Sequence, residues 1–261
     1  EYKVKGADDS TYTTTAPSAA GDYVVRVTVA ESKNYKAASA TAEFTIGRAT
    51  ITDISVEQDG KLTYNGGDAL TPVVVEKATS MNGQPVTFKY STLQDGTYGS
   101  LPSFDKAGIY TVYYKATAPN HNETTGSFTV TVEKAIVTEA TIASKPFNNS
   151  AQKADISDTD LYTVVKNDGG TAKGEYDVIL KLKDAANYKW STTESAEVTL
   201  KFVICAAENS WMTEPSISGW TYGQNANEPA YAAKYGTVKV MYTGKANDGS
   251  DYNSESAPTK A

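Results

Sequence analysis

The chain has 261 residues, of which 39% are hydrophobic, and this is enough for about two or three small domains with packed cores. It carries 24 basic and 31 acidic residues, a net charge of -7, which argues against nucleic-acid and membrane-surface partners because both need a positive surface. Its apolar runs are far shorter than the roughly 18 residues that cross a bilayer. A single cysteine excludes an internal disulfide without arguing against secretion.

Residues 1–48 contain the first copy of a recurring pattern. In AGDYVVRVTV every second residue from Tyr23 to Val29 is apolar, which is typical of a strand that lies on a core. A polar stretch with the pair Asn34-Tyr35 follows and is expected to be a loop. The next segment, AEFTI, alternates again, so the pattern predicts a hairpin of two long strands.

The same pattern recurs in residues 49–134. A short motif typical of a turn and containing an aromatic residue, LTYNGG from Leu62, is followed by the strand candidate VTFKYS from Val86. The glycine-tyrosine strand AGIYTVYYKA then carries Tyr110, the pair Asn120-His121 is expected in a loop, and SFTVTV forms the last strand. We therefore expect a complete unit here.

Residues 135–206 follow a shorter version of the plan. KPFNNS is the turn-like word, KGEYDVILKL carries Tyr176, Asn187 precedes Tyr188 in the loop, and VTLKFVI ends the unit. Thr159 to Lys166 is the nearest approach to a helical segment, and it is short. The chain is therefore expected to be all β.

Residues 207–261 open with GWTYGQ and the strand candidate TVKVMYT from Thr237, and they end on YNSESAPTKA. This ending matches YTTTAPSAAGDY near the start of the chain, but stops before Gly-Asp-Tyr. We therefore interpret residues 207–261 as the N-terminal half of a unit and residues 1–48 as a C-terminal half. Because half a unit leaves an apolar face bare, we expect the two halves to associate head to tail between molecules.

Many short strands with turn signals between them suggest two-sheet sandwiches. Gly-x-Tyr-x-Val on the penultimate strand matches the tyrosine corner of immunoglobulin-like domains, in which the hydroxyl bonds to a nearby backbone carbonyl. An alternative fold is a β-grasp-like repeat with one short helix. The corner residues would be Tyr23, Tyr110 and Tyr176.

Three longer stretches carry a resemblance to a known family. They are AGDYVVRVTVAESKNYKAASATAEFTI from Ala20 to Ile46, NYKW from Asn187 to Trp190, and SISGWTYGQNANEP from Ser216 to Pro229. They resemble the tandem immunoglobulin-like repeats of large, adhesin-type bacterial cell-surface proteins, familiar from Gram-positive gut organisms. The resemblance implies an elongated array of β-sandwich domains outside the cell. No wall-sorting motif is visible, so the signal and the anchor are expected outside this stretch.

Residues capable of catalysis are few. His121 is the single histidine, and its place in the pattern is filled by Tyr35 and Tyr188 elsewhere, which favours an ordinary loop residue over a catalytic one. Cys205 stands at a junction after a final strand, without a base that would activate a thiol. We expect no enzymatic activity and no cofactor.

Two sets of residues are candidate binding sites. An acidic turn, NDGSD, is a weak calcium candidate through Asn247, Asp248 and Asp251, and a solvated hairpin turn explains it equally well. Loop aromatics form a candidate platform for sugar rings, the alternative being that they cap core edges. They are Trp190, Trp211, Trp220 and Tyr188.

The leading functional hypothesis is a non-enzymatic stalk or spacer of a secreted bacterial cell-surface protein, in which each unit contacts mainly its neighbours and the array presents an adhesive or catalytic tip. The alternative is a carbohydrate-binding or adhesive module that contacts a host or dietary glycan or protein through loop aromatics. A self-formed Lys-Asn amide bond, known in such surface domains, has many candidates in this chain, and none is singled out.

Overall fold

The computed structural model describes residues 1–259, and these form an all-β fold made of several separate sheets. Within that range, no helix is long and apolar enough to cross a membrane. The chain divides into two compact units, and the strands of each are given below. The first unit comprises residues 1–139, 159–162 and 181–198, and the second comprises residues 140–158, 163–180 and 199–259.

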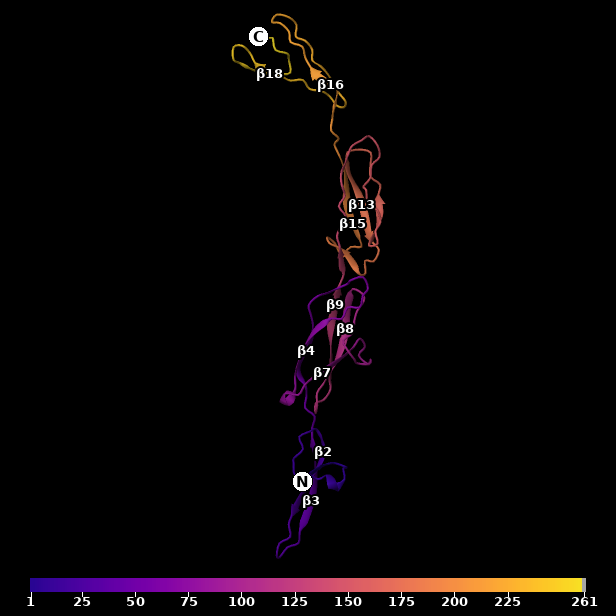
Figure 1. The fold of residues 1–261 in the computed structure, drawn as a ribbon, viewed down its shortest axis with the longest axis vertical. Helices are drawn as coiled ribbons and strands as arrows, with labels where there is room; N and C mark the ends of the chain where they lie inside the picture. Colours follow the sequence, from indigo (N-terminus) through magenta and orange to yellow (C-terminus); the bar gives the residue numbers. More distant parts are fainter. Residues whose placement is uncertain (260–261) are drawn as a thin grey trace. The chain divides into compact units, whose positions relative to one another are not determined.

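The first unit begins with a three-stranded antiparallel sheet of order β1-β2-β3 (Figure 1). The long hairpin of this sheet runs in unbroken register from Gly21 opposite Ile46 to Val29 opposite Ala38. A short helical turn, η1 (Asp9–Thr11), lies between the first two strands. The strands are β1 (Tyr2–Val4), β2 (Gly21–Val29) and β3 (Ala38–Ile46).

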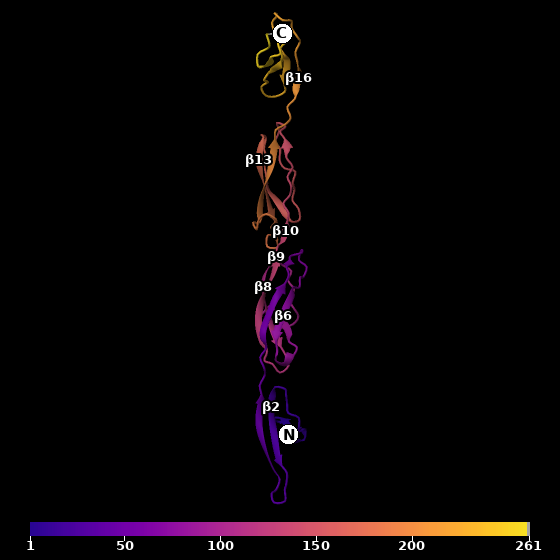
Figure 2. The ribbon, with the colours of Figure 1, turned by 90° about the vertical axis from the view of Figure 1, so that its left-hand side faces the viewer.

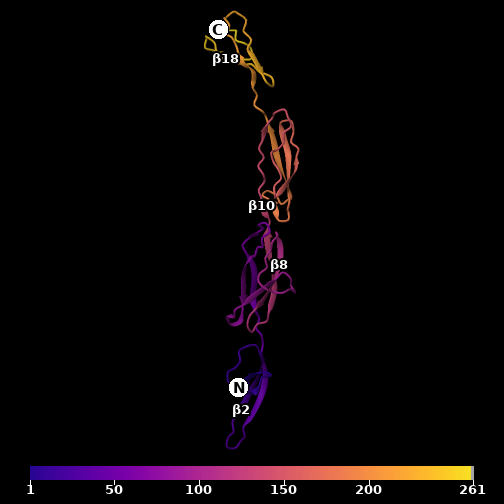
Figure 3. The ribbon, with the colours of Figure 1, turned by 45° about the vertical axis from the view of Figure 1, so that its right-hand side comes forward.

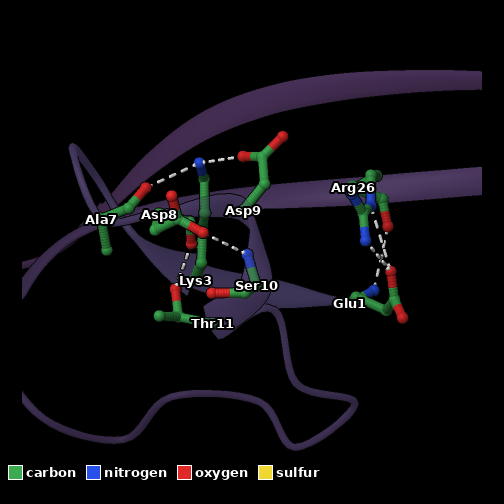
Figure 4. Close-up of polar contacts among 8 residues, drawn as sticks. All are labelled: Glu1, Lys3, Ala7, Asp8, Asp9, Ser10, Thr11 and Arg26. Atoms are coloured by element: carbon green, nitrogen blue, oxygen red, sulfur yellow. Dashed lines mark hydrogen bonds and ion pairs between the residues drawn. The ribbon is translucent and has the colours of Figure 1, made fainter.

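Side-chain contacts hold the short strand β1 against β2 (Figure 4). The guanidinium of Arg26 donates to one carboxylate oxygen of Glu1 through Nε at 3.0 Å and through Nη2 at 2.6 Å. The ammonium of Lys3 donates to the carbonyl of Ala7 at 2.9 Å and also pairs with the carboxylate of Asp9. The Lys3 side chain is mostly covered, at 13% exposure, but the carboxylates of Glu1 and Asp9 are open to water, so these pairs position β1 more than they stabilise it.

Residues 49–134 form two sheets (Figures 1 and 2). A two-stranded sheet pairs β4 with β6, and a four-stranded sheet has the order β5-β9-β8-β7. The 3-10 turn η2 (Met81–Gly83) lies between β6 and β7. The strands are β4 (Thr52–Asp59), β5 (Leu62–Thr63), β6 (Val73–Thr79), β7 (Thr87–Ser91), β8 (Gly108–Thr117) and β9 (Thr124–Glu133).

A hydrophobic core joins these two sheets. Val56 of β4 packs with Val112 of β8 and Val130 of β9, and the two valines of the larger sheet have an exposed fraction of 0%. Phe104, from the segment before β8, stacks on Tyr110 with 4.2 Å between ring centroids. The alternation in β8 and β9 therefore directs one face of the hairpin into this core, and each buried valine stabilises the fold by roughly 1.5–3 kcal/mol.

The first unit also contains a parallel pair, β10 (Ala135–Val137) with β14 (Tyr188–Trp190). The loop that carries Asn187 precedes β14 directly. This pair therefore brings the start of one predicted segment beside a loop that lies about 50 residues later in the chain.

The second unit contains most of a four-stranded sheet of order β11-β15-β13-β12. Its core side chains include Leu180, Phe202 and Ile204, each at most 1% exposed. Thr159 to Lys166, the nearest approach to a helical pattern, runs into strand β12, in agreement with the all-β expectation. The strands are β11 (Lys145–Pro146), β12 (Tyr162–Asn167), β13 (Gly174–Leu182) and β15 (Glu197–Cys205).

The last part of the second unit has small two-stranded sheets, β16 with β17 and β18 with β19 (Figure 3). No residue from 207 to 259 is buried. The strand expected from Thr237 begins only at Tyr242, because the preceding residues pair with no other strand of the described chain. The strands are β16 (Trp211–Ser216), β17 (Ala230–Ala233), β18 (Tyr242–Lys245) and β19 (Asp251–Ser254).

The three tyrosines of the Gly-x-Tyr pattern make the same local hydrogen bond. Each hydroxyl donates to the backbone carbonyl of the residue four positions earlier, at 2.7 to 2.9 Å. Each bond closes the turn that leads into a long strand, so a half-polar ring can lie at the edge of a core with its hydroxyl satisfied. The pairs are Tyr23 with Ala19, Tyr110 with Lys106, and Tyr176 with Ala172.

Candidate functional site at the segment junctions

The first site, junction A, consists of Ala20, Arg48, Ala49, Asn120 and His121. The amide oxygen of Asn120 accepts the N–H of Ala20 at 3.0 Å, and its backbone carbonyl accepts the N–H of Ala49 at 3.0 Å. Ala49 forms a parallel bridge with His121, and Arg48 Nη1 donates to the carbonyl of His121 at 3.2 Å. The end of the β2–β3 hairpin is thus hydrogen-bonded to the loop between β8 and β9.

Junction B consists of Ala107, Lys134, Ala135, Ala185 and Asn187. The amide oxygen of Asn187 accepts the N–H of Ala107 at 2.8 Å, and its backbone carbonyl accepts the N–H of Ala135 at 2.9 Å. Lys134 Nζ donates to the carbonyl of Ala185 at 2.7 Å. The end of the β8–β9 hairpin is therefore bound to the loop before β14 in the way that the preceding hairpin is bound at junction A.

The two junctions share one design. In each, an asparagine amide oxygen binds the alanine before Gly-x-Tyr, the asparagine backbone carbonyl binds the connecting strand, and a basic side chain donates to a carbonyl of the same loop. At junction B the connection between the hairpin and the next strand is very short, since Lys134 alone separates β9 from β10, whereas residues 47–51 separate β3 from β4 at junction A. Such a connection has little of the freedom of a flexible linker.

An aromatic contact adds to junction B. The ring of Tyr188 meets the ring of Tyr64 edge to face, with 5.2 Å between centroids and 88° between planes. Burial, followed by the charges of Tyr188 and nearby aspartates, raises the pKa of Tyr64. Both rings are half-buried, so their contact adds aromatic packing to the hydrogen bonds of junction B.

His121 supplies the corresponding ring at junction A. It is a loop residue, as the pattern predicts, and it is 5% exposed. Its Nε2 accepts the N–H of Met81 at 2.9 Å, and its Nδ1 lies 2.7 Å from the carbonyl of Pro119, so Nδ1 carries the proton and the ring is neutral. Both nitrogens are thereby engaged in structural bonds, which leaves neither available as a base or a metal ligand.

Asp184 orients the asparagine of junction B. Its carboxylate accepts Asn187 Nδ2 at 2.7 Å and the backbone N–H groups of Ala186 and Asn187 at 3.2 Å. The hydrogen bond from Asn187 is the main cause that lowers the pKa of Asp184. Because Nδ2 is fixed on this carboxylate, Oδ1 faces the N–H of Ala107.

Glu139 closes the turn after β14 in a similar way. Its carboxylate accepts the hydroxyls of Ser191 and Thr192 and the N–H of Thr192 at 2.9 Å. These bonds, led by that of Ser191, lower the pKa of Glu139 to about 2. The group is therefore ionised at neutral pH and serves as the acceptor that holds this turn.

The candidate glycan contacts fall in both units, Tyr188 and Trp190 in the first and Trp211 and Trp220 in the second. The assignment of Trp190 is wrong, because its ring is 1% exposed and its Nε1–H donates to the carbonyl of Ala196 at 3.2 Å. Tyr188 packs on Tyr64. Trp211 is 42% exposed in β16, whereas Trp220 lines a separate hollow of about 540 Å³ with Tyr222.

The calcium candidates do not form a ligand set. One oxygen of Asp248 accepts the N–H of Ser250 at 2.9 Å and its hydroxyl at 2.5 Å, and these bonds lower the pKa of Asp248. Asp251 lies 3.4 Å from the ammonium of Lys245, a cation that disfavours a second one nearby. Asn247 is exposed. Among residues 1–259, no group of at least three His, Cys, Asp or Glu side chains could hold a metal.

The junction contacts could not be read from any single residue. The signal that could have shown them was recurrence: an asparagine stands before each loop ring, and an alanine stands before two of the three Gly-x-Tyr motifs.

The single cysteine lies at the end of β15, where the Sγ of Cys205 is 3.5 Å from the carbonyl of Lys145.

No known family model matches the chain, and a search of curated proteins finds no significant match.

Proposed function

We propose that this protein is a non-enzymatic spacer in a bacterial cell-surface protein, built of tandem immunoglobulin-like units that hold an adhesive or catalytic tip away from the cell. The single observation that supports the proposal is the shared design of junctions A and B. A spacer needs repeats whose connections resist bending. At junctions A and B, the segment that follows each hairpin is hydrogen-bonded to a loop of the next repeat, and this supplies such resistance. The proposed location outside the cell rests on the resemblance in sequence.

The mechanism is mechanical. A pull along the chain loads the hydrogen bonds of Asn120 and Asn187 together with the adjoining strand pairs. Each asparagine holds two backbone N–H groups from different segments, so bending a junction must break two bonds at once. Each such bond stabilises the closed junction by about 0.5–1.5 kcal/mol.

The test is a distance measurement across junction B. Spin labels are attached to Leu93→Cys and Glu194→Cys in a Cys205→Ser background, since Leu93 and Glu194 are exposed. Wild-type junction residues should give a narrow distance distribution, and Asn187→Ala should broaden it. Asn34→Ala, at the matching loop position with an exposed side chain, is the control and should leave the distribution narrow. A broad distribution with Asn187 present would contradict the proposal.

A second candidate function is glycan binding at the hollow of about 540 Å³ beside Trp220. Tyr222 lines this hollow with 74% of its surface exposed, and Gln224 adds a polar group. An aromatic face with a nearby hydrogen-bonding side chain suits a sugar ring. Glycan-array binding should be lost with Trp220→Ala and Tyr222→Ala and kept with Tyr235→Ala; an array without any binding would remove this candidate.

A further inference from the structure

The C-terminal end of β15 has the backbone geometry of junction B. At junction B, the N–H of Tyr64 donates to the carbonyl of Glu133, which ends β9, at 2.9 Å. In the second unit, the N–H of Phe147 donates to the carbonyl of Cys205, which ends β15, also at 2.9 Å. The strands that precede these rings pair in parallel with β9 and β15 in the same way. Phe147 therefore occupies the place that Tyr64 has at junction B.

The two backbone donors of the junction are also present at this end. Lys173 precedes Gly-x-Tyr as Ala107 does, and Ala207 follows the end of β15 as Ala135 follows the end of β9. At junction B, the corresponding N–H groups both donate to Asn187. Within residues 140–158, 163–180 and 199–259, neither the N–H of Lys173 nor that of Ala207 donates a hydrogen bond.

A hollow of about 700 Å³ lies between these groups. Its floor includes the half-buried ring of Phe147, the counterpart of the ring on which Tyr188 packs at junction B. Lys173, Lys234 and Glu208 also belong to its lining residues, so its rim carries charges of both signs. The hollow thus combines an aromatic side chain with two backbone donors that have no acceptor among the described residues of this unit.

One loop has the complementary groups, and within residues 1–259 neither the side chain of Asn34 nor the ring of Tyr35 has a hydrogen-bond or ring partner. Asn34 and Tyr35 stand between β2 and β3 as Asn120 and His121 stand between β8 and β9, and Tyr35 is 79% exposed. A backbone bridge between Ser32 and Tyr35 keeps the loop tight. Glu31 lies three residues before Asn34, as Asp184 lies three before Asn187. Because Lys33 and Lys36 lie in the same loop, hydrogen bonds and ring packing, and not net charge, would carry the contact.

We propose that the hollow beside Phe147 is a docking site for the Asn34-Tyr35 loop of a second copy of this chain. In the docked state, Asn34 Oδ1 accepts the N–H of Lys173, the carbonyl of Asn34 accepts the N–H of Ala207, and the ring of Tyr35 packs on Phe147. The inference deepens the proposed function, on whose junction geometry it rests. Because the two surfaces differ, the contact is heterologous and links copies head to tail.

The docking requires no exchange of strands. Strand β1 remains paired with β2, since the loop lies at the opposite end of the hairpin from Tyr23. One loop buries much less than the roughly 1,200 Å² of a stable interface, so the dissociation constant should be on the order of 0.1–1 mM. Several copies held side by side would raise the apparent affinity through their high local concentration.

The first experiment measures association of the full chain by sedimentation velocity over rising protein concentration. The wild-type chain should show reversible, concentration-dependent association, and Asn34→Ala combined with Tyr35→Ser should weaken it by about tenfold or more. Because Tyr35 is exposed, this variant should fold normally. Lys36→Ala, next to the loop, is the matched control. A wild-type chain that stays monomeric at millimolar concentration would overturn the proposal.

The second experiment identifies the contacting surfaces. In a Cys205→Ser background, one protein carries Lys36→Cys, an exposed position next to the loop ring, and the other carries Asn148→Cys, an exposed residue that lines the hollow. A short bismaleimide should join the two different proteins far more often than two identical ones; a statistical mixture would contradict the docking. If cross-linking fails but the spin-label distance distribution across junction B is narrow, the docking alone is refuted. A broad distance distribution across junction B in the chain with Asn187 would refute the spacer.

Discussion

The hairpins β2–β3 and β8–β9 have the same sequence plan, but they differ in burial toward the end away from Gly-x-Tyr. Both begin with Gly-x-Tyr, and both strands that follow alternate apolar and polar residues. Yet Ala116 of β8 is 0% exposed, whereas Val29, at the same position of β2, is 64% exposed. The larger apolar side chain is therefore the one that lies in water.

The cause is what covers each hairpin. Strands β4 and β6 cover one face of β8–β9, with Val56 and Val74 packed into the shared core. In residues 1–48, the ring of Phe44 contacts Tyr23 and Tyr2, and beyond these rings the face of β2 is open, with Val27 at 63% exposure. Alternation thus decides which residues share a face, and a second sheet decides whether that face is buried.

The largest effect should come from placing a carboxylate on each hairpin at matched positions. Ala116→Asp buries an unpaired charge and should reduce the free energy of unfolding of residues 49–134 by about 3–5 kcal/mol. Val29→Asp should change stability by less than about 0.5 kcal/mol because the side chain is exposed. Urea denaturation with hydrogen exchange of β8 and β2 as the local readout measures both; equal effects would break the comparison.

The aromatic partners of the two Gly-x-Tyr tyrosines give the next test. Phe104 is 6% exposed and stacks on Tyr110, so Phe104→Ala should cost about 3–5 kcal/mol of stability. Phe44 stacks on Tyr23 with 5.6 Å between centroids and is half-buried, so Phe44→Ala should cost about 1–2 kcal/mol. Thermal unfolding followed by near-ultraviolet circular dichroism compares the two variants. An equal loss would show that β2–β3 has a more complete core than we describe.

Removing the tyrosine hydroxyls should act equally on both hairpins. Tyr23→Phe and Tyr110→Phe each delete a 2.9 Å bond to a carbonyl four residues earlier, with an expected cost of about 0.5–1.5 kcal/mol. The bond is local, so it does not depend on a covering sheet. Amide exchange at Gly21 and Gly108 measures the local opening, and a loss confined to Tyr110→Phe would mean that the bond needs the core after all.

The smallest effect concerns pH and β1. Hydrogen bonds from Arg26 are the main cause that holds the pKa of Glu1 below its ordinary value of 4.5. The ionised form of Glu1 is therefore favoured when β1 is paired, so this support is complete above about pH 4.5 and is lost as the pH falls through the lowered pKa. Amide shifts of Val25 should follow this transition, and Glu1→Gln should abolish it. The amide of Val112, which lies in the core and away from the Lys115–Glu123 pair of β8, should not follow it.

The residues that form the junctions recur in the sequence, but their long-range hydrogen bonds could not be predicted from it. Asn120 and Asn187 could be placed in loops from their polar surroundings and their position after Gly-x-Tyr strands. That their amide oxygens bind Ala20 and Ala107 requires contacts over 100 and 80 residues, which no local pattern specifies. For the same reason, Trp190 could be predicted beside a loop but not inside a core.

The sequence by itself determined the all-β class, the long Gly-x-Tyr strands and the side of each strand that carries apolar residues, because these depend on backbone preference and on a period of two. The tertiary structure alone decided which of those apolar faces became cores, which asparagines became junction bonds, and that Phe147 and Tyr35 remain without ring partners in the part of the chain that is described. Burial depends on a second surface, and that surface is supplied by residues distant in the chain.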